Sequence, residues 1–325
     1  MKKKVILLSL LVIVIVVCFI PVTIQKTIAI KSPLLNVYEQ LSNPQNWEKW
    51  RPDIKKVFIA DSNKISIQKD IPTSFRIKYA GQELNVISNE NLFVINDTRG
   101  DNKTVNYSYT IVPDQLQMTV LDNHPKKTLV TANKKVSLLT YLIGRLRPVS
   151  FSDTHIDDFK RYMETDSLLY GCKIIRTGVP ENNLIVIDNS VLAKNKFSEA
   201  AKLLSKLQQY LKTHNDIKQM RPLIAQFIPK GLDSAQIKVG IFVNKKVESE
   251  NEIKYNRMPK GGTFYIAGFK GRFNERHRVY KGLQQYFTNH LYQTVLLPFE
   301  TYLDNKLPTS DTDEVNIEII FPAYF

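Results

Sequence analysis

Apolar and polar residues alternate in many short runs over the first half of the chain, which is the pattern of half-buried β-strands. The first run is Thr23–Ile30, and further runs lie at 56–60, 64–69, 74–80, 83–88, 91–96, 105–112, 116–122 and 127–134. A short helical stretch, Leu34–Leu41, follows the helix-start signal Ser32-Pro33, and residues 153–168 have apolar positions at near-helical spacing. The pattern predicts a strand, short helices, a many-stranded antiparallel sheet and a closing helix.

From residue 183 onward the pattern repeats itself. A strand, a helix and two strands are predicted at 183–190, 196–213, 222–228 and 236–243, and again at 262–270, 276–291, 296–303 and 315–321. The offsets between corresponding elements are 79, 80, 74 and 79 residues. One strand-helix-strand-strand unit therefore occurs twice, which predicts two pseudo-symmetric halves that share one sheet or face each other across a groove.

A different pattern opens the chain. The run from Val5 to Val22 has eighteen residues without a charge and follows three lysines. As a helix it would span roughly 27 Å, which is enough to cross a bilayer. The run predicts a transmembrane signal anchor at residues 1–22, with the N-terminus in the cytoplasm and the body outside it. A cleaved signal peptide and lipidation at Cys18 remain alternatives.

Charge and cysteine content exclude some classes of function. The net charge is +14, with +7 in residues 1–170 (23 Lys+Arg against 16 Asp+Glu) and +7 in residues 171–325 (22 against 15). A nucleic-acid binder concentrates its basic residues on one surface, so this even spread predicts no nucleic-acid partner. Beyond Cys18 the only cysteine is Cys172, which rules out an intrachain disulfide or a multi-cysteine zinc site in the body. No metal site and no cofactor is predicted.

The segment AIKSPLLNVYEQLSNPQNWEKWRP, residues 29–52, resembles the opening of the SRPBCC superfamily of START-like and polyketide-cyclase-like proteins. The resemblance implies a helix-grip fold over residues 23–168, in which a curved sheet surrounds a lipophilic cavity. An apolar ligand would follow from such a cavity. Trp47 and Trp50 are interpreted as residues that fill the core between helices and sheet, with ligand contact as the alternative. The superfamily has no common catalytic motif, so no catalytic residues are predicted.

In the repeat, superposing Pro222 on Pro298 sets Ile224 against Glu300, so a carboxylate breaks the symmetry. On a strand, Glu300 and Tyr302 point to the same face, which places an acid beside an aromatic ring. A carboxylate in apolar surroundings is costly unless something neutralises it, and a bound cation would do so. The alternative is a glutamate on the solvent side of an edge strand.

Three motifs in order, GGTFYIAGFKGRF (261–273), LPFETYLDN (297–305) and VNIEIIFPAY (315–324), resemble the GyrI-like effector-binding fold over residues 171–325. The resemblance implies two strand-helix-strand-strand units with an effector pocket between them. It also implies that Glu300 meets cationic lipophilic ligands, with Tyr302 and Phe273 as aromatic neighbours. Arg272 stands where the family usually has proline, and residues 274–277 make this turn unusually polar and basic.

The predicted fold class is α+β, with a transmembrane helix, a START-like domain and a duplicated GyrI-like domain. The leading functional hypothesis is a membrane-tethered, non-enzymatic protein that binds or senses small lipophilic or amphipathic molecules. One alternative is a GyrI-like hydrolase in which Glu300 is the general base and Tyr302 the acid. The other is an envelope protein-interaction module whose pockets are filled by side chains. An open aromatic groove at Glu300 favours binding, and a closed one favours the interaction module.

Overall fold

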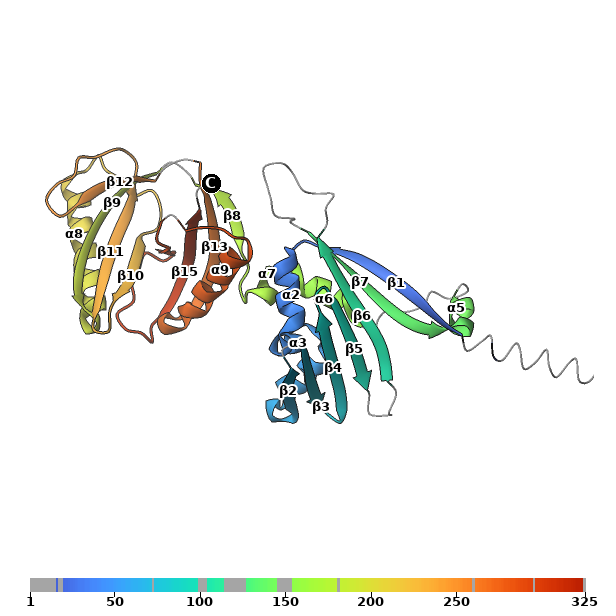
Figure 1. Ribbon diagram of the computed structural model, residues 1–325. Coiled ribbons are helices and arrows are strands. Elements are labelled where there is room, and N and C mark those ends of the chain that lie inside the picture. Colours follow the sequence, from blue (N-terminus) through green and yellow to red (C-terminus); the bar gives the residue numbers. More distant parts are fainter. Residues whose placement is uncertain are drawn as a thin grey trace, which may run out of the picture. The chain divides into compact units, whose positions relative to one another are not determined.

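The computed structural model describes residues 16, 20–71, 73–98, 104–113, 127–144, 154–179, 182–258, 261–294 and 296–323. The chain divides into two compact units, unit 1 up to Leu169 and unit 2 from Tyr170 (Figure 1). Each unit is built on one antiparallel sheet that carries helices, so the described part of the chain is a mixed α+β protein. The expected strand at 116–122 lies outside the described residues.

Unit 1 is a seven-stranded sheet in the order β1-β7-β6-β5-β4-β3-β2, with its core between the sheet's inner face and the short helices. Along 82–89, 92–98 and 104–113, alternation sends mostly apolar residues, together with Ser88 and Asp97, to that inner face and many Asn, Ser and Thr residues to the outer one. Its elements are β1 (Pro21–Ile30), α2 (Leu34–Ser42), α3 (Pro44–Trp50), α4 (Pro52–Ala60), β2 (Ile65–Ile71), β3 (Ser74–Tyr79), β4 (Gln82–Asn89), β5 (Leu92–Thr98), β6 (Thr104–Pro113), β7 (Thr128–Ser137), α5 (Leu138–Gly144), α6 (Ile156–Met163) and α7 (Asp166–Leu169).

One predicted strand of unit 1 is wrong. Residues 56–60 belong to helix α4, not to a strand. Their β-branched and aromatic composition favours a strand, but Pro52 at the first helical position and Asp53 in the first turn start a helix. Ile54 is then buried at the helix–sheet contact, while Ile59 is 72% exposed. Helix-start chemistry therefore overrides local β-propensity here.

The structure also corrects the membrane prediction. Among the described residues, no helix is long and apolar enough to cross a membrane. Most of the predicted span lies outside the described residues, and its last two residues, Pro21 and Val22, begin strand β1, in register with Ser137 and Val136 of β7. The transmembrane helix in the predicted fold class is therefore wrong. The single-pass location, with the N-terminus in the cytoplasm and the body outside it, is overturned with it.

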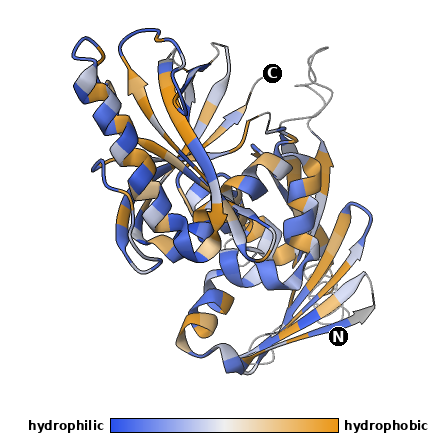
Figure 2. Cartoon of the chain, turned by 90° about the vertical axis from the view of Figure 1, so that its left-hand side faces the viewer, coloured by the Kyte–Doolittle hydropathy of each residue, from blue (hydrophilic) through white to orange (hydrophobic). Residues whose placement is uncertain are grey.

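Unit 2 is an eight-stranded sheet in the order β12-β9-β11-β10-β14-β15-β13-β8. Helix α8 packs on strands β9 and β11, and in Figure 2 this helix carries hydrophilic and hydrophobic residues on different sides. The elements of unit 2 are β8 (Ile175–Gly178), β9 (Asn182–Leu192), α8 (Lys196–Thr213), β10 (Ile224–Lys230), β11 (Ser234–Val243), β12 (Lys254–Met258), β13 (Thr263–Arg272), α9 (His277–Asn289), β14 (Phe299–Tyr302) and β15 (Glu314–Ala323).

The strand order of unit 2 reads symmetrically about its central β10–β14 pair. Strands β9, β10 and β11 correspond to β13, β14 and β15, with starting residues 81, 75 and 80 apart, and helices α8 and α9 start 81 apart. Both helices also end in the same way. The ring of His214 packs at a tilt on Tyr210 at a centroid distance of 4.2 Å, and that of His290 stacks on Tyr286 at 4.0 Å. A shared helix ending in addition to a shared topology supports an internal duplication.

Gly282 lets helix α9 approach the segment that precedes β8. A Cβ atom at this position would overlap the carbonyl oxygen of Tyr170 and lie 3.1 Å from Cys172 Sγ. We therefore expect Gly282→Ala to destabilise the protein by about 1–3 kcal/mol through overpacking, although alanine favours an isolated helix. Gly268→Ala on β13 is the matched control, because no atom lies within 4 Å of its Cβ position. Thermal unfolding followed by circular dichroism compares the two, and equal stability of both variants would contradict the expectation.

Candidate functional site

Glu300 lies at the centre of unit 2. On the antiparallel β10–β14 pair it is directly opposite Ala225, and the 75-residue offset of these strands makes Ala225 its counterpart in the first repeat. The pseudo-twofold axis of the sheet therefore passes between the two residues. The alignment of Pro222 with Pro298 is therefore one residue out of register, and the counterpart of Glu300 is Ala225 instead of Ile224. Ile224 pairs with Thr301 and packs with Phe299 on the opposite face of the sheet. The connection after the proline is one residue longer in the first repeat.

The Glu300 carboxylate is buried and accepts hydrogen bonds on both oxygens. Only 1% of the side chain is exposed. Oε1 accepts from Arg276 Nε at 2.6 Å and from the Tyr280 hydroxyl at 2.9 Å, and Oε2 accepts from the Tyr302 hydroxyl at 2.5 Å. Burial, and then the negative charge of Glu300, raise the pKa of both tyrosines well above the ordinary value. The two phenols are therefore neutral donors to the carboxylate.

The guanidinium of Arg276 lies between Glu300 and an aromatic ring. Its Cζ atom is 3.4 Å from the centroid of the Phe273 ring, and its Nη1 donates to the Phe273 carbonyl oxygen at 2.9 Å. Phe273 itself is fully buried, whereas the Arg276 side chain is 17% exposed. An ion pair on one side and a stacked ring on the other are the two contacts by which proteins hold planar organic cations.

Further rings surround Phe273. The rings of Phe197, at the start of α8, and Phe227, on β10, lie with their centroids 5.4 and 5.2 Å from that of Phe273 in edge-on arrangements. Both belong to the first repeat, whereas Phe273 and Arg276 belong to the second. Lys196 brings a second cation, with its Nζ 4.6 Å from the Phe197 centroid. The candidate site therefore consists of the Glu300 carboxylate surrounded by aromatic and basic side chains, and both repeats contribute residues to it.

The sequence prediction named Glu300, Tyr302 and Phe273. The structure places all three in this cluster, where Glu300 and Tyr302 are in direct contact and Phe273 reaches the acid through Arg276. Their role in ligand binding stays a prediction. Arg276 and Tyr280 are neighbours of the acid that the sequence prediction did not include. The available signal was their spacing of four residues within the helix predicted at 276–291, which would put both on one helical face.

In unit 1, Trp47 and Trp50 belong to the buried core between the short helices and the sheet. Trp47 and Trp50 are 0% and 3% exposed, and their rings pack on each other at 4.6 Å. Phe75 on β3 packs edge-on against Trp47, and Phe159 on α6 packs at a tilt against Trp50. The interpretation of both tryptophans as core residues is confirmed. A hollow of about 580 Å³ lies elsewhere, outside the core, and is lined by Ser42, Asn43, Pro44, Gln45, Ile67 and Lys69.

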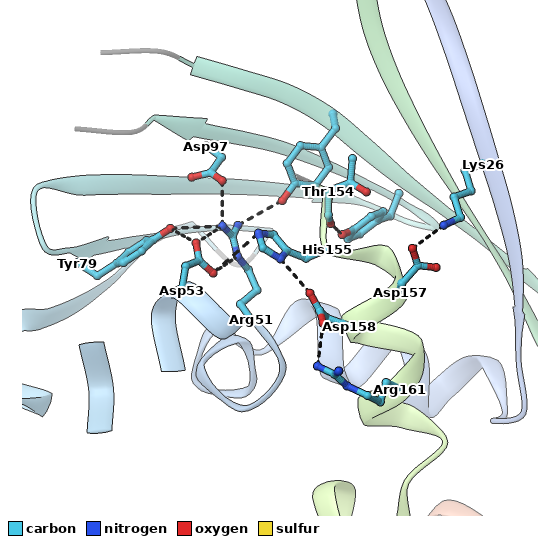
Figure 3. Close-up of polar contacts among 12 residues, drawn as sticks. Lys26, Arg51, Asp53, Tyr79, Asp97, Thr154, His155, Asp157, Asp158 and Arg161 are labelled. Atoms are coloured by element: carbon cyan, nitrogen blue, oxygen red, sulfur yellow. Dashed lines mark hydrogen bonds and ion pairs between the residues drawn. The ribbon is translucent and has the colours of Figure 1, made fainter. Parts of the chain in front are cut away.

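A second polar cluster, in unit 1, surrounds Arg51 (Figure 3). Arg51 is 0% exposed, and its guanidinium donates to Asp53 on α4 at 2.5 Å and to Asp97 on β5 at 2.9 Å. The hydroxyls of Tyr79 and Tyr107 accept from it at 3.3 and 3.2 Å. The residue that joins α3 to α4 is therefore fastened to strands β3, β5 and β6. We interpret this cluster as structural, because it links elements and faces no hollow described for this unit.

Because of Asp53, the stability of unit 1 depends on pH in the acid range. Burial alone would raise the pKa of its carboxyl, but the Arg51 charge and hydrogen bonds from Arg51 and Tyr79 outweigh it and lower that pKa to about 2. Because the folded-state pKa is depressed, this stabilisation is complete above pH 4 and is lost as the pH falls from about 4 to 2. We expect a loss of roughly 2 kcal/mol across that window. Urea midpoints between pH 5 and 2 measure it.

Asp53→Asn is the matched variant for the pH series, since its amide does not titrate. Its stability should change less between pH 4 and 2 than that of the wild type. Asp313 titrates in the same window, with a pKa of about 2 that hydrogen bonds from Ser310 and Thr309 produce, but it is common to both proteins. Identical pH profiles for wild type and Asp53→Asn would show that Asp53 makes no such contribution.

No protein-family model matches the chain, and no curated protein matches it. Solved structures give weak likenesses. The C-terminal domain of EcmrR is 20% identical with a TM-score of 0.39, covering 47% of this chain and 97% of that one. SAV2435 bound to tetraphenylphosphonium is 12% identical with a TM-score of 0.29, covering 46% and 93%. A START superfamily protein from Mycobacterium smegmatis is 14% identical with a TM-score of 0.29, covering 44% and 97%. We draw no function from likenesses at this level.

Proposed function

We propose that the chain is a non-enzymatic small-molecule binding protein, and that unit 2 binds aromatic or amphipathic cations at Glu300. The observation that carries the proposal is the position of the Arg276 guanidinium, 2.6 Å from Glu300 and 3.4 Å from the Phe273 centroid. These are the contacts that an aromatic cation would make.

A purely structural role explains Glu300 less well. Its counterpart across the pseudo-twofold axis is Ala225, so the sheet tolerates a small apolar residue at this position. Apolar side chains of similar volume often stabilise a fold at least as well as a buried ion pair does. A carboxylate kept at 1% exposure on the symmetry axis is therefore better explained by a cation that it receives.

The test measures the melting temperature of the full chain with a panel of aromatic cations and of electrophiles. We expect cations to raise the melting temperature of the wild type and to lose this effect in Glu300→Gln, without product formation. Glu318→Gln is the matched control, because Glu318 pairs with Thr301 and so lies on the other face of the sheet. Product that disappears with Glu300→Gln would instead indicate the hydrolase.

A protein-interaction module is the second candidate, and the burial of Glu300, Tyr302 and Phe273 favours it. A closed site needs no small ligand and can serve only to shape a surface. No shift of the melting temperature with any probe, in the wild type or in variants that open the site, would favour this candidate over ligand binding.

A further inference from the structure

We infer that Arg276 is a built-in competitor of the ligand: its guanidinium occupies the cation position at Glu300, and the site admits planar cations that carry N–H donors. This inference rests on the proposed function and deepens it by naming the class of ligand and the residue that selects it.

Arg276 fills the site with the same kinds of group that a ligand would need. Its Nε–H satisfies Glu300 Oε1, its flat face covers the Phe273 ring, and its Nη1 satisfies the Phe273 carbonyl oxygen. A planar amidinium or guanidinium ligand can replace all three contacts. A tetrahedral onium ion has no N–H group, so Oε1 would keep only the hydrogen bond from Tyr280 and lose the charge-assisted one that Arg276 supplies.

Arg276 can leave the site more easily than the other charged member of the pair. It stands at the end of the single 3₁₀ turn Phe273–Arg276, before α9 begins, and its side chain is 17% exposed against 1% for Glu300. A long, partly exposed arginine can turn its guanidinium into water, where the charge is solvated. Glu300, on a central strand, has no such route.

The turn that carries Arg276 is tied to both repeats. The backbone N–H groups of Phe273 and Asn274 donate to the carbonyl oxygens of Asp313 and Asp311 at 2.9 Å. The Asp311 carboxylate in turn accepts from Lys196 Nζ, at the start of α8, at 2.7 Å. Release of Arg276 therefore occurs next to a link between the halves, which explains how a small ligand could be sensed by both.

The experiment uses the full chain and three probes: benzamidinium, its neutral isostere benzamide, and tetraphenylphosphonium. Calorimetry compares the wild type with Arg276→Gln, which removes the charge but keeps a donor for Glu300. We expect benzamidinium to bind Arg276→Gln at least about tenfold more tightly than the wild type, since the ligand no longer displaces a charge-assisted hydrogen bond. Benzamide should not bind, tetraphenylphosphonium should gain less, and Arg276→Gln/Glu300→Gln should lose the gain.

Arg278→Gln is the matched control, because this neighbouring arginine lies 5.3 Å over Phe269 and makes no described contact with Glu300. It should bind benzamidinium as the wild type does. In the wild type, the Arg276 Nε–H resonance should shift towards that of a solvated arginine on saturation. If Arg276→Gln does not fold, Arg276→Lys replaces it; lysine keeps the charge without the planar fork and should give a smaller gain.

Two failures are distinguishable. Equal affinity of wild type and Arg276→Gln, with both dependent on Glu300, would overturn the role of Arg276 and leave the proposed binding function intact. Folded Arg276→Gln that binds none of the probes, or binds them regardless of Glu300, would overturn the proposed function as well.

Discussion

Arg51→Met is expected to lower the free energy of unfolding of unit 1 by about 3–5 kcal/mol. Arg51 is fully buried, and its partner Asp97 is 1% exposed, so the substitution leaves a carboxylate without its cation in the core. Methionine fills much of the volume, so the loss comes from the orphaned charge and not from a cavity. Urea unfolding followed by tryptophan fluorescence measures it, because both tryptophans of the chain, Trp47 and Trp50, lie in this unit.

Arg161→Met is the matched control for this prediction. Arg161 also pairs with an aspartate, Asp158 at 2.8 Å, but its side chain is 67% exposed. Exposed pairs contribute about 0–1 kcal/mol, so this variant should stay near the wild type. Adding Asp97→Asn to Arg51→Met should recover part of the loss, since the buried group is then neutral. If Arg51→Met and Arg161→Met lowered the free energy of unfolding equally, the buried Asp97 carboxylate would not depend on the charge of Arg51.

The repeat of unit 2 could be predicted from the sequence because it is a matter of periodicity. Helical and strand periods locate elements without any knowledge of how they pack, and the alternation along a strand correctly placed Glu300 and Tyr302 on one face. The exact register between the repeats was less accessible. It depends on one extra residue after Pro222, which the pairing of Ala225 with Glu300 reveals.

The closure of the site could not be predicted in the same way. Whether Arg276 turns inward or into solvent depends on its rotamer and on the position of the turn before α9, and neither leaves a period in the sequence. The basic composition of residues 274–277 indicated an unusual turn but not its contact with Glu300. The strand predicted at residues 56–60 was wrong for a related reason. Their composition is typical of a strand, and only Pro52, as a helix start, indicates helix α4.

The two units share one property that the family resemblances did not suggest. In unit 2 a side chain of the protein, Arg276, occupies the position at Glu300. In unit 1 the core between the helices and the sheet contains Trp47, which packs on Phe75, and Trp50, which packs on Phe159. Each unit is thus closed by its own residues. The closure differs in kind, because an arginine near the surface can leave and a buried tryptophan cannot.

Trp47→Ala is therefore expected to lower the free energy of unfolding of unit 1 by about 3–5 kcal/mol and to create a site for an aromatic molecule. Trp47 is fully buried, and its indole N–H donates to the Leu41 carbonyl oxygen at 2.9 Å, so truncation leaves both an empty volume and an unpaired acceptor. Added indole should restore part of the melting temperature, because it matches that volume and that acceptor. Thermal unfolding by differential scanning calorimetry, without indole and with increasing indole, measures both effects, because free indole would mask the fluorescence of the remaining Trp50.

Trp50→Phe is the control that separates cavity from chemistry. The Trp50 indole nitrogen is buried and makes no hydrogen bond among the described residues, so phenylalanine removes an unmet donor at a small loss of volume. We expect a change below about 1.5 kcal/mol and no response to indole. If Trp47→Ala were as stable as Trp50→Phe, the space at Trp47 would have to close by collapse of the helices onto the sheet. In that case the spacing between the helices and the sheet of unit 1 would not depend on the Trp47 side chain.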